Sequence, residues 1–192
     1  MADTHDRLLE VTARIFAEAG YHGTTTRRIA QEAEVNEVTL FRHFGTKEAL
    51  IREALSSANL RSRPMLDSAA PDPSGELERW ALAAFHRFYQ HRNLIRRLMG
   101  DSVERPEIAP TFCQDANEEY RQLARFLETL KSQGEVRADL DVLPASGMLV
   151  GALLSNALWR DLFPDVEPAE DTVRGYVSVL RRAAGLERKA KR

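Results

Sequence analysis

Apolar residues recur at helical spacing along most of this chain, which predicts an all-α protein with about nine helices. Two short apolar stripes lie within residues 24–44, namely Ile29, Ala30 and Ala33, followed by Val35, Leu40 and Phe44. Thr24 to Thr26 can open the first of these helices and Asn36 the second, because short polar side chains cap unpaired backbone amides. Helices this short cannot bury their stripes alone, so they must pack on each other and on a third helix, as in a helix-turn-helix.

The same spacing predicts longer helices on both sides of this region. Gly20 and Gly134 are natural helix stops because glycine readily adopts the left-handed conformation, and the Thr46 hydroxyl can cap a helix start. Residues 64–75 hold three prolines and a glycine and are therefore predicted to form a loop. The predicted longer helices cover approximately 4–19, 46–61, 76–99, 106–134, 144–163 and 170–184.

The last two predicted helices carry surfaces suited to packing against another helix. Gly147, Gly151 and Ser155 recur at every fourth position, a spacing that lets a partner backbone approach closely. The final helix has an apolar stripe made of Val173, Tyr176, Val177, Leu180 and Ala184. These surfaces either bury each other within one chain or join two copies of it.

The composition is that of a soluble globular protein, with 43% hydrophobic and 29% charged residues. The 192 residues suffice for a small helical domain attached to a larger one. Cys113 is the only cysteine, so no disulfide within the chain is expected. Charges near the N-terminus are incompatible with a secretory signal, and the longest apolar run, at 148–154, is far below the roughly 20 residues that cross a bilayer. We therefore predict a cytoplasmic protein that makes no contact with a membrane.

The segment from Leu8 to Leu50 resembles the DNA-binding domain of the TetR family of bacterial transcriptional regulators. The rest of the chain is similar to the family only in length, helical patterning and order of elements. The resemblance implies a helix-turn-helix DNA-binding domain over 1–46 and a helical effector-binding and dimerisation domain over 47–186, and we expect a basic disordered tail at 187–192. The matching residues are Ile15, Phe16, Gly20, Thr25, Ile29, Ala30, Ala33, Val35, the run from Thr39 to Phe44 and the run from Lys47 to Leu50.

The family resemblance implies a ligand-responsive transcriptional regulator rather than an enzyme. In this family the final two long helices form a four-helix bundle with their symmetry mates, so the last two predicted helices are assigned to a homodimer interface. We call the DNA-binding domain of each copy its head. Two heads related by a two-fold axis predict a palindromic operator on double-stranded DNA. A small-molecule effector of unknown class would release the operator, and repression is expected because most family members repress.

A recognition helix enters the major groove with polar side chains facing base edges. Leu40 and Phe44 are expected to point inward, which leaves the rest of that helix for DNA. The start of the preceding helix can hold a phosphate, and the resemblance implies that Arg27 can reach a base and Lys47 a phosphate. The predicted DNA-binding residues are Thr25, Thr26, Arg27, Arg28, Asn36, Glu37, Val38, Thr39, Phe41, Arg42, His43 and Lys47.

Several residues of this region depart from the family pattern. Glu34 stands where a turn glycine is usual, Val38 occupies a position that is often small, and Phe41 lacks the hydroxyl of the common tyrosine. The carboxylate of Glu37 would be repelled by phosphates unless it accepts a hydrogen bond from a cytosine amino group. The first fifty residues also hold six Lys and Arg against eight Asp and Glu, although a basic surface is the usual sign of nucleic-acid binding.

The effector site is predicted in the larger domain, although core packing is the commoner role for every candidate. Asn117 and Asn156 are favoured because an amide on an apolar stripe needs a hydrogen-bond partner. The arginines of the helix at 76–99 either pair with acids elsewhere or meet an anionic ligand. The predicted effector-binding residues are Trp80, Phe85, Phe88, Tyr89, Phe112, Cys113, Asn117, Tyr120, Asn156 and Trp159, with Met99 and Met148 as further candidates.

Common catalytic and metal-binding motifs are absent from the sequence. It has no Gly-rich phosphate loop, no Gly-x-Ser-x-Gly and no His-Glu-x-x-His. His86 and His91 are five residues apart and do not share a helix face, so they make a weak metal pair. We therefore predict no enzymatic activity, no cofactor and no metal site. The alternative to a regulator is a helical small-molecule-binding protein of the same fold without specific DNA binding.

Overall fold

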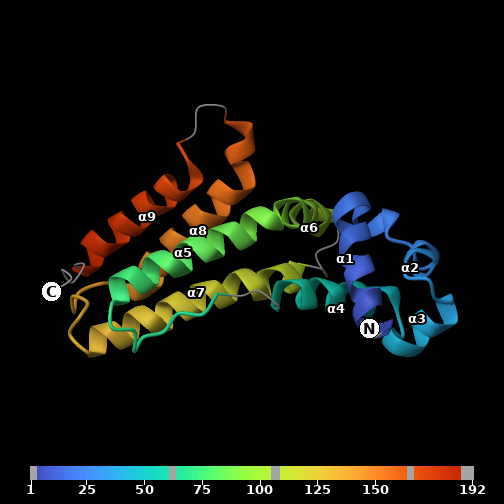
Figure 1. Ribbon diagram of the computed structural model, residues 1–192, viewed down its shortest axis with the longest axis horizontal. Coiled ribbons are helices and arrows are strands. Elements are labelled where there is room, and N and C mark those ends of the chain that lie inside the picture. Colours follow the sequence, from blue (N-terminus) through green and yellow to red (C-terminus); the bar gives the residue numbers. More distant parts are fainter. Residues whose placement is uncertain (1–3, 61–63, 105–108, 164–166, 187–192) are drawn as a thin grey trace. The chain divides into compact units, whose positions relative to one another are not determined.

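The computed structural model describes residues 4–60, 64–104, 109–163 and 167–186, and the side chains at 56–60, 104 and 109–116 lie outside the description. Nine α-helices and one 3₁₀ turn run through these ranges, which contain no strand (Figure 1). The prediction of an all-α fold is therefore confirmed. The helices pack into two compact units, each with its own apolar core.

The first unit comprises Met1–Ser62 and His91–Asp115. It contains α1 (Thr4–Gly23), α2 (Thr26–Glu32), α3 (Glu37–Phe44), α4 (Lys47–Leu60) and α6 (Arg92–Glu104). Helix α1 packs against α2, α4 and α6, while α3 packs against α2 and α4. The helix-turn-helix formed by α2 and α3 thus packs on α1 and α4, and α6 packs in turn on α1.

Two apolar clusters hold the first unit together. One joins the first four helices through Leu8, Leu9, Val11, Ile15, Ile29, Ala33, Leu40, Phe44, Leu50 and Ala54. The other joins α1, α4 and α6 through Phe16, Tyr21, Ile51, Leu55, Leu94 and Leu98. Leu40 and Phe44 point inward, as the stripe on α3 predicts.

The predicted polar caps and the unusual turn are present in the first unit. The Asn36 side-chain oxygen accepts a hydrogen bond from the Val38 backbone N–H at 2.8 Å, and the Thr46 hydroxyl accepts one from the Ala49 N–H at 3.0 Å. Glu34 lies in the turn between α2 and α3 with φ of 53°. This turn therefore holds a non-glycine residue in the left-handed region, which is strained for an L side chain.

Gly20 interrupts α1, as predicted. Its φ of 66° is not helical, and the chain makes a further turn before α1 ends at Gly23. A β-carbon at Gly20 would collide with the guanidinium of Arg97 on α6. The backbone conformation therefore favours glycine here, whereas the contact with the flexible end of the Arg97 side chain could be relieved by a rotation of that side chain.

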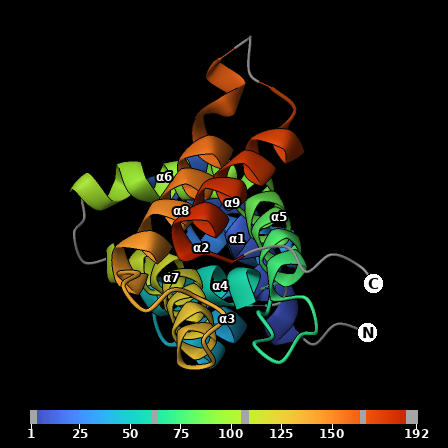
Figure 2. The same ribbon diagram turned by 90° about the vertical axis from the view of Figure 1, so that its left-hand side faces the viewer.

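The second unit comprises Arg63–Gln90 and Ala116–Arg192. It contains α5 (Pro73–Gln90), most of α7 (Ala109–Ser132), α8 (Val142–Trp159) and α9 (Ala169–Ala184). Helix α5 packs against α8 and α9, and α8 and α9 run side by side in both views (Figures 1 and 2). Its most deeply buried side chains include Leu77, Trp80, Phe85, Leu123, Leu127, Leu153, Val173 and Val177.

The prediction of one continuous helix over 76–99 is wrong. In one continuous helix, the residue two turns after Phe88 on the same side would be Ile95. Ile95 is only half-buried, whereas Leu94 and Leu98 are buried. The apolar stripe thus changes register after α5, where the chain begins α6. The two helices serve different cores, because α5 packs against α8 and α9 whereas α6 packs against α1.

Other boundaries differ by a few residues. Helix α5 begins at Pro73, within the predicted loop, because proline suits the first turn of a helix. Helix α8 begins at Val142 and ends in a 3₁₀ turn at Arg160–Leu162. Gly134, with φ of 76°, follows the end of α7 as predicted. The predicted helix start at 106 and the predicted tail at 187–192 lie outside the described residues, and the domain boundary after residue 46 stays a prediction.

Helix α8 belongs to a longer apolar segment than the run at 148–154 on which the sequence prediction was based. The segment Val142–Leu162 is long and apolar enough to cross a membrane by length and composition alone, so the prediction that no stretch reaches this length is wrong. Leu149, Leu153 and Ala157 are nevertheless buried within the second unit. A helix that is apolar nearly all round is also typical of the core of a helical domain.

Candidate nucleic-acid interface and effector domain

Helix α3 has one side in the core and another side toward solvent. Val38 and Phe41 are 73% and 44% exposed, which is unusual for large apolar side chains. Glu37 and Thr39 are half-buried, while Asn36, Arg42 and His43 are exposed. The structure therefore gathers the predicted recognition residues on and beside one accessible helix surface that combines polar, cationic and apolar groups.

The two arginines at the start of α2 have different surroundings. Arg27 is exposed, whereas the guanidinium of Arg28 donates to Glu32 at 2.7 Å and to Glu18 at 2.8 Å. Arg14 also pairs with Glu32 at 2.8 Å. The hydrogen bond from Arg28 is the main cause that lowers the pKa of Glu32, and the same bond raises the pKa of Arg28. Arg28 thus fastens α2 to α1, and its contact with DNA stays a prediction.

The starts of α2 and α3 are joined by a side-chain hydrogen bond. The Thr26 hydroxyl donates to the Glu37 carboxylate at 2.9 Å. Thr25, the residue before Thr26, caps α2 by accepting a hydrogen bond from the Arg28 N–H at 3.2 Å. The sequence marks these residues as helix openers but does not indicate that the two helix starts meet.

Lys47 at the start of α4 is held by Tyr21. Its ammonium donates to the Tyr21 carbonyl oxygen at 2.8 Å and lies 4.0 Å from the centroid of the Tyr21 ring. The Tyr21 hydroxyl donates to Glu48, and its backbone N–H donates to Asp101 on α6 at 2.9 Å. The sequence identifies Tyr21 only as a turn residue after Gly20 and gives no sign of this role.

The N-terminal part of α1 supports the end of α3. The His5 ring stacks on Phe44 with centroids 4.8 Å apart and lies edge-on to His43 at 6.0 Å. The Nε2 atom of His5 also lies 2.9 Å from a carboxylate oxygen of Glu53 on α4. The hydrophobic pattern does not reveal this contact, because His5 is polar and half-buried.

The aromatic candidates for effector binding occupy the interior of the second unit. Trp80, Phe85 and Phe88 are buried, and the Trp80 indole N–H donates to the Gln122 side-chain oxygen at 3.0 Å. The Tyr89 hydroxyl donates to Asp161 at 2.9 Å. The three buried rings pack as core residues in this structure, and their contact with an effector stays a prediction.

The remaining candidates are divided between the units. Asn117, Tyr120, Asn156 and Trp159 belong to the second unit, whereas Met99, Phe112 and Cys113 belong to the segment His91–Asp115 of the first. The Asn156 side-chain oxygen accepts a hydrogen bond from Arg160 at 2.9 Å, which supplies the partner that an amide on an apolar stripe needs. Asn117 is exposed, Tyr120 is half-buried, and Trp159 is exposed. The side chains of Phe112 and Cys113 lie outside the described residues. Among the described residues, no group of three or more His, Cys, Asp or Glu could hold a metal ion.

A buried ion pair joins α5 to α7. Arg87 donates to Glu119, and their side chains are 5% and 0% exposed. Of the two alternatives for the arginines at 76–99, pairing with an acid elsewhere therefore holds for Arg87. Removing one member of such a pair leaves an uncompensated charge in the core, which is far more unfavourable than losing a surface ion pair.

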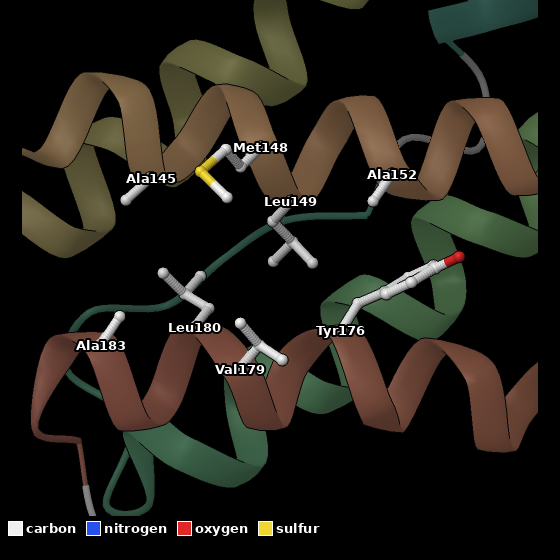
Figure 3. A pocket seen from close by; sticks show the side chains of 8 residues that line it. All are labelled: Ala145, Met148, Leu149, Ala152, Tyr176, Val179, Leu180 and Ala183. Carbon is white, nitrogen blue, oxygen red and sulfur yellow. The ribbon is translucent and has the colours of Figure 1, made fainter.

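An apolar groove of about 180 Å³ lies between α8 and α9. Side chains from both helices point toward one another across it (Figure 3). Met148 is the one effector-binding candidate among its lining residues, which are Ala145, Met148, Leu149, Ala152, Tyr176, Val179, Leu180 and Ala183. Met148 and Val179 at this groove are 72% and 52% exposed, so α8 and α9 expose large apolar side chains to solvent at the groove.

Comparison with known proteins identifies families that match each half of the chain. Residues 8–54 match the family of bacterial regulatory proteins named tetR, and residues 78–180 match the C-terminal domain of AefR-like transcriptional repressors. The transcriptional repressor KstR2 of Mycobacterium tuberculosis is 31% identical over 144 residues, which cover 70% of each chain.

Solved structures have the same arrangement of helices. The regulator PfmR from Thermus thermophilus superposes with a TM-score of 0.67 at 27% identity, covering 95% of this chain and 100% of that one. The flavonoid-responsive regulator FrrA gives a TM-score of 0.74 at 21% identity, covering 94% and 96%. With matches to both halves of the chain and a relative above 30% identity, this protein belongs to the TetR family of bacterial regulatory proteins.

Proposed function

We propose that this protein is a ligand-responsive transcriptional repressor that binds a palindromic operator as a homodimer and leaves it when a small molecule binds. The accessible surface of α3 is the observation that carries this proposal. Leu40 and Phe44 anchor the helix in the core, while Thr39 and Arg42 lie on or near its solvent side. Side chains of these two types read base edges in a major groove that admits one helix.

The charges around α3 argue for binding through two heads rather than one. Arg27 and Arg42 are exposed cations, but Arg28 and Lys47 already make hydrogen bonds within the unit. A single head therefore offers few cations for phosphates, and counterion release, which supplies much of the affinity for DNA, is correspondingly small. Two heads on successive major grooves about 34–36 Å apart would double the number of contacts.

The exposed apolar surface on α8 and α9 supports the second copy as the partner. Met148 and Val179 would leave water at such an interface, and Gly147, Gly151 and Ser155 are exposed on α8, where small residues permit close helix packing. A two-fold axis through this surface would join the same patch of both copies, as in most homodimers.

The effector is proposed to act through the second unit. A small molecule lowers operator affinity only if it binds more tightly to a head spacing that does not fit the operator. The relative KstR2 is named a repressor, and we extend repression to this chain on that basis. A regulator acts on DNA in the cytoplasm, and we propose that location for this protein.

The proposed function is tested by a mobility-shift titration with the DNA upstream of the gene for this protein. We expect a salt-dependent shift that Thr39→Ala and Arg42→Ala abolish while the dimer, measured by analytical ultracentrifugation, is retained. Arg125→Ala is the matched control, because it removes an exposed cation from the other unit. Shifts of equal strength for all four proteins would contradict the assignment of α3 as the recognition helix.

A small-molecule-binding protein of this fold without specific DNA binding is a second candidate. The observation that favours it is the engagement of Arg28 and Lys47 inside the unit, on a head with more acids than bases. Selection from a random DNA library separates the two functions, since this candidate predicts that no sequence is enriched.

A further inference from the structure

Glu37 is fixed in position at the start of the recognition helix. It is the first residue of α3, and its carboxylate oxygen Oε2 accepts the hydrogen bond from Thr26, the first residue of α2. The side chain is half-buried. A glutamate on an open surface samples many rotamers and loses that conformational entropy when it binds a ligand. The hydrogen bond from Thr26 already restricts the Glu37 side chain, so less entropy is lost on binding.

The surface beside Glu37 is the one proposed to face the major groove. Val38 follows it in the chain and is 73% exposed. Recognition helices of this motif approach base edges with their N-terminal residues. In the part of the chain that the structure describes, Thr26 is the hydrogen-bond partner of the carboxylate through Oε2, so Oε1 can accept a hydrogen bond from DNA.

The four bases differ in what they offer to a carboxylate in the major groove. Cytosine presents only its amino group, which donates, whereas guanine and thymine present acceptors. Adenine presents an amino group beside the acceptor N7, which would repel a second carboxylate oxygen. A carboxylate is therefore matched best by cytosine and opposed by guanine and thymine.

We propose that Glu37 selects cytosine at one base pair of each operator half-site and that Thr26 is its positioning residue. This inference rests on the proposed function. The negative charge of Glu37 is repelled by the phosphates of every sequence, and cytosine offsets that repulsion best because it presents an amino donor without a neighbouring acceptor. The residue therefore lowers binding to unrelated DNA more than binding to the operator, which is how a repulsive group creates specificity.

The test is selection of bound sequences from a randomised DNA library by the full-length wild-type protein and by Glu37→Gln. We expect the wild type to enrich cytosine at one symmetric position, with a roughly tenfold loss of affinity when that base pair is changed. The Glu37→Gln variant should enrich adenine there instead, because a carboxamide bonds adenine N6 and N7 together.

Glu34→Gln is the matched control. It removes the same charge from the exposed turn just before α3, so it should strengthen binding to all sequences and keep the preference for cytosine. Thr26→Val should weaken that preference and Thr26→Ser should restore it, because serine keeps the hydroxyl that holds Glu37. A melting curve for each variant verifies folding, and Thr26→Val decides the question if Glu37→Gln does not fold.

The outcomes separate this inference from the proposed function. A palindrome selected equally by the wild type and by Glu37→Gln, with the same base at every position, would overturn the role of Glu37 and leave the repressor intact. Failure of the wild type to enrich any sequence would overturn both. A change from cytosine to adenine at one symmetric position supports both.

Discussion

The carboxylate of Asp101 on α6 accepts a hydrogen bond from the backbone N–H of Tyr21 at 2.9 Å. Tyr21 in turn holds Lys47 and Glu48 at the start of α4. Helix α6 is therefore bonded into the unit that carries α3, although α5, which directly precedes it in the chain, belongs to the other unit.

Replacing Asp101 with alanine should weaken the attachment of α6 to α1. The Tyr21 N–H would lose its acceptor, which typically lowers the free energy of unfolding by about 1 kcal/mol. Hydrogen exchange of the Tyr21 amide should become faster, and the urea midpoint should fall. Ser102→Ala on the same helix is the control. An unchanged exchange rate at Tyr21 would show that Asp101 does not hold this turn.

Acid should remove the stabilisation that Arg28 provides. Glu32 has a folded-state pKa below its ordinary value of 4.5, mainly because Arg28 donates a hydrogen bond to it. The lower pKa in the folded state means that the stabilisation is complete above the ordinary value and disappears as pH falls through the lowered one. Arg28→Ala should thus reduce the urea midpoint at neutral pH, less so in high salt because the pair is solvated.

The same variant should match the wild type more closely at acid pH, once the pH has fallen through the lowered pKa of Glu32. Denaturation curves at both pH values measure the difference. A deficit of equal size at neutral and acid pH would mean that Arg28 stabilises the unit by packing rather than through Glu32.

The buried pair of Arg87 and Glu119 should be sensitive to loss of one partner. Arg87→Met leaves a carboxylate without its cation in the core, which should destabilise the protein by roughly 3–5 kcal/mol. The double variant with Glu119→Leu should regain most of that loss, because apolar side chains of similar volume often replace a buried pair without penalty. Chemical denaturation checks both variants, and equal stability of the single and double variants would contradict this account.

A charge in the groove between α8 and α9 should separate the proposed dimer. Val179→Glu places a carboxylate on the exposed apolar surface, where it would lose its hydration on association. Sedimentation should show a monomer, circular dichroism an unchanged helical content, and the mobility-shift titration little operator binding. Ser132→Glu, at the exposed end of α7, is the control. A dimer that persists in Val179→Glu would place the interface elsewhere.

Much of the helix-turn-helix could be predicted because its determinants are local. The caps at Asn36 and Thr46 and the stop at Gly20 depend on atoms within a few residues of one another. The unusual backbone at Glu34 follows from the missing glycine in the same way. The inward position of Leu40 follows from helical spacing alone.

The break after α5 could not be predicted in this way. Residues 76–99 have one helical composition, and the change of register of the apolar stripe after Phe88 is their one local sign of a break. The packing of α5 on α8 and α9 and of α6 on α1 shows that the two stripes serve different cores. Likewise, helical spacing offers Arg28 a local partner in Glu32, four residues on. Its second partner, Glu18 on α1, comes within reach only in the folded unit.

By itself, the sequence determined where helices begin, which side of each is apolar and which family the head resembles, since these depend on residues near one another in the chain. Tertiary structure alone decided which charges remain exposed. Thr26 meets Glu37, Tyr21 meets Lys47, and Arg87 meets Glu119 only after distant segments have packed. The partner of a polar side chain cannot be identified from its own residue type, because it depends on which groups lie within hydrogen-bonding distance after folding.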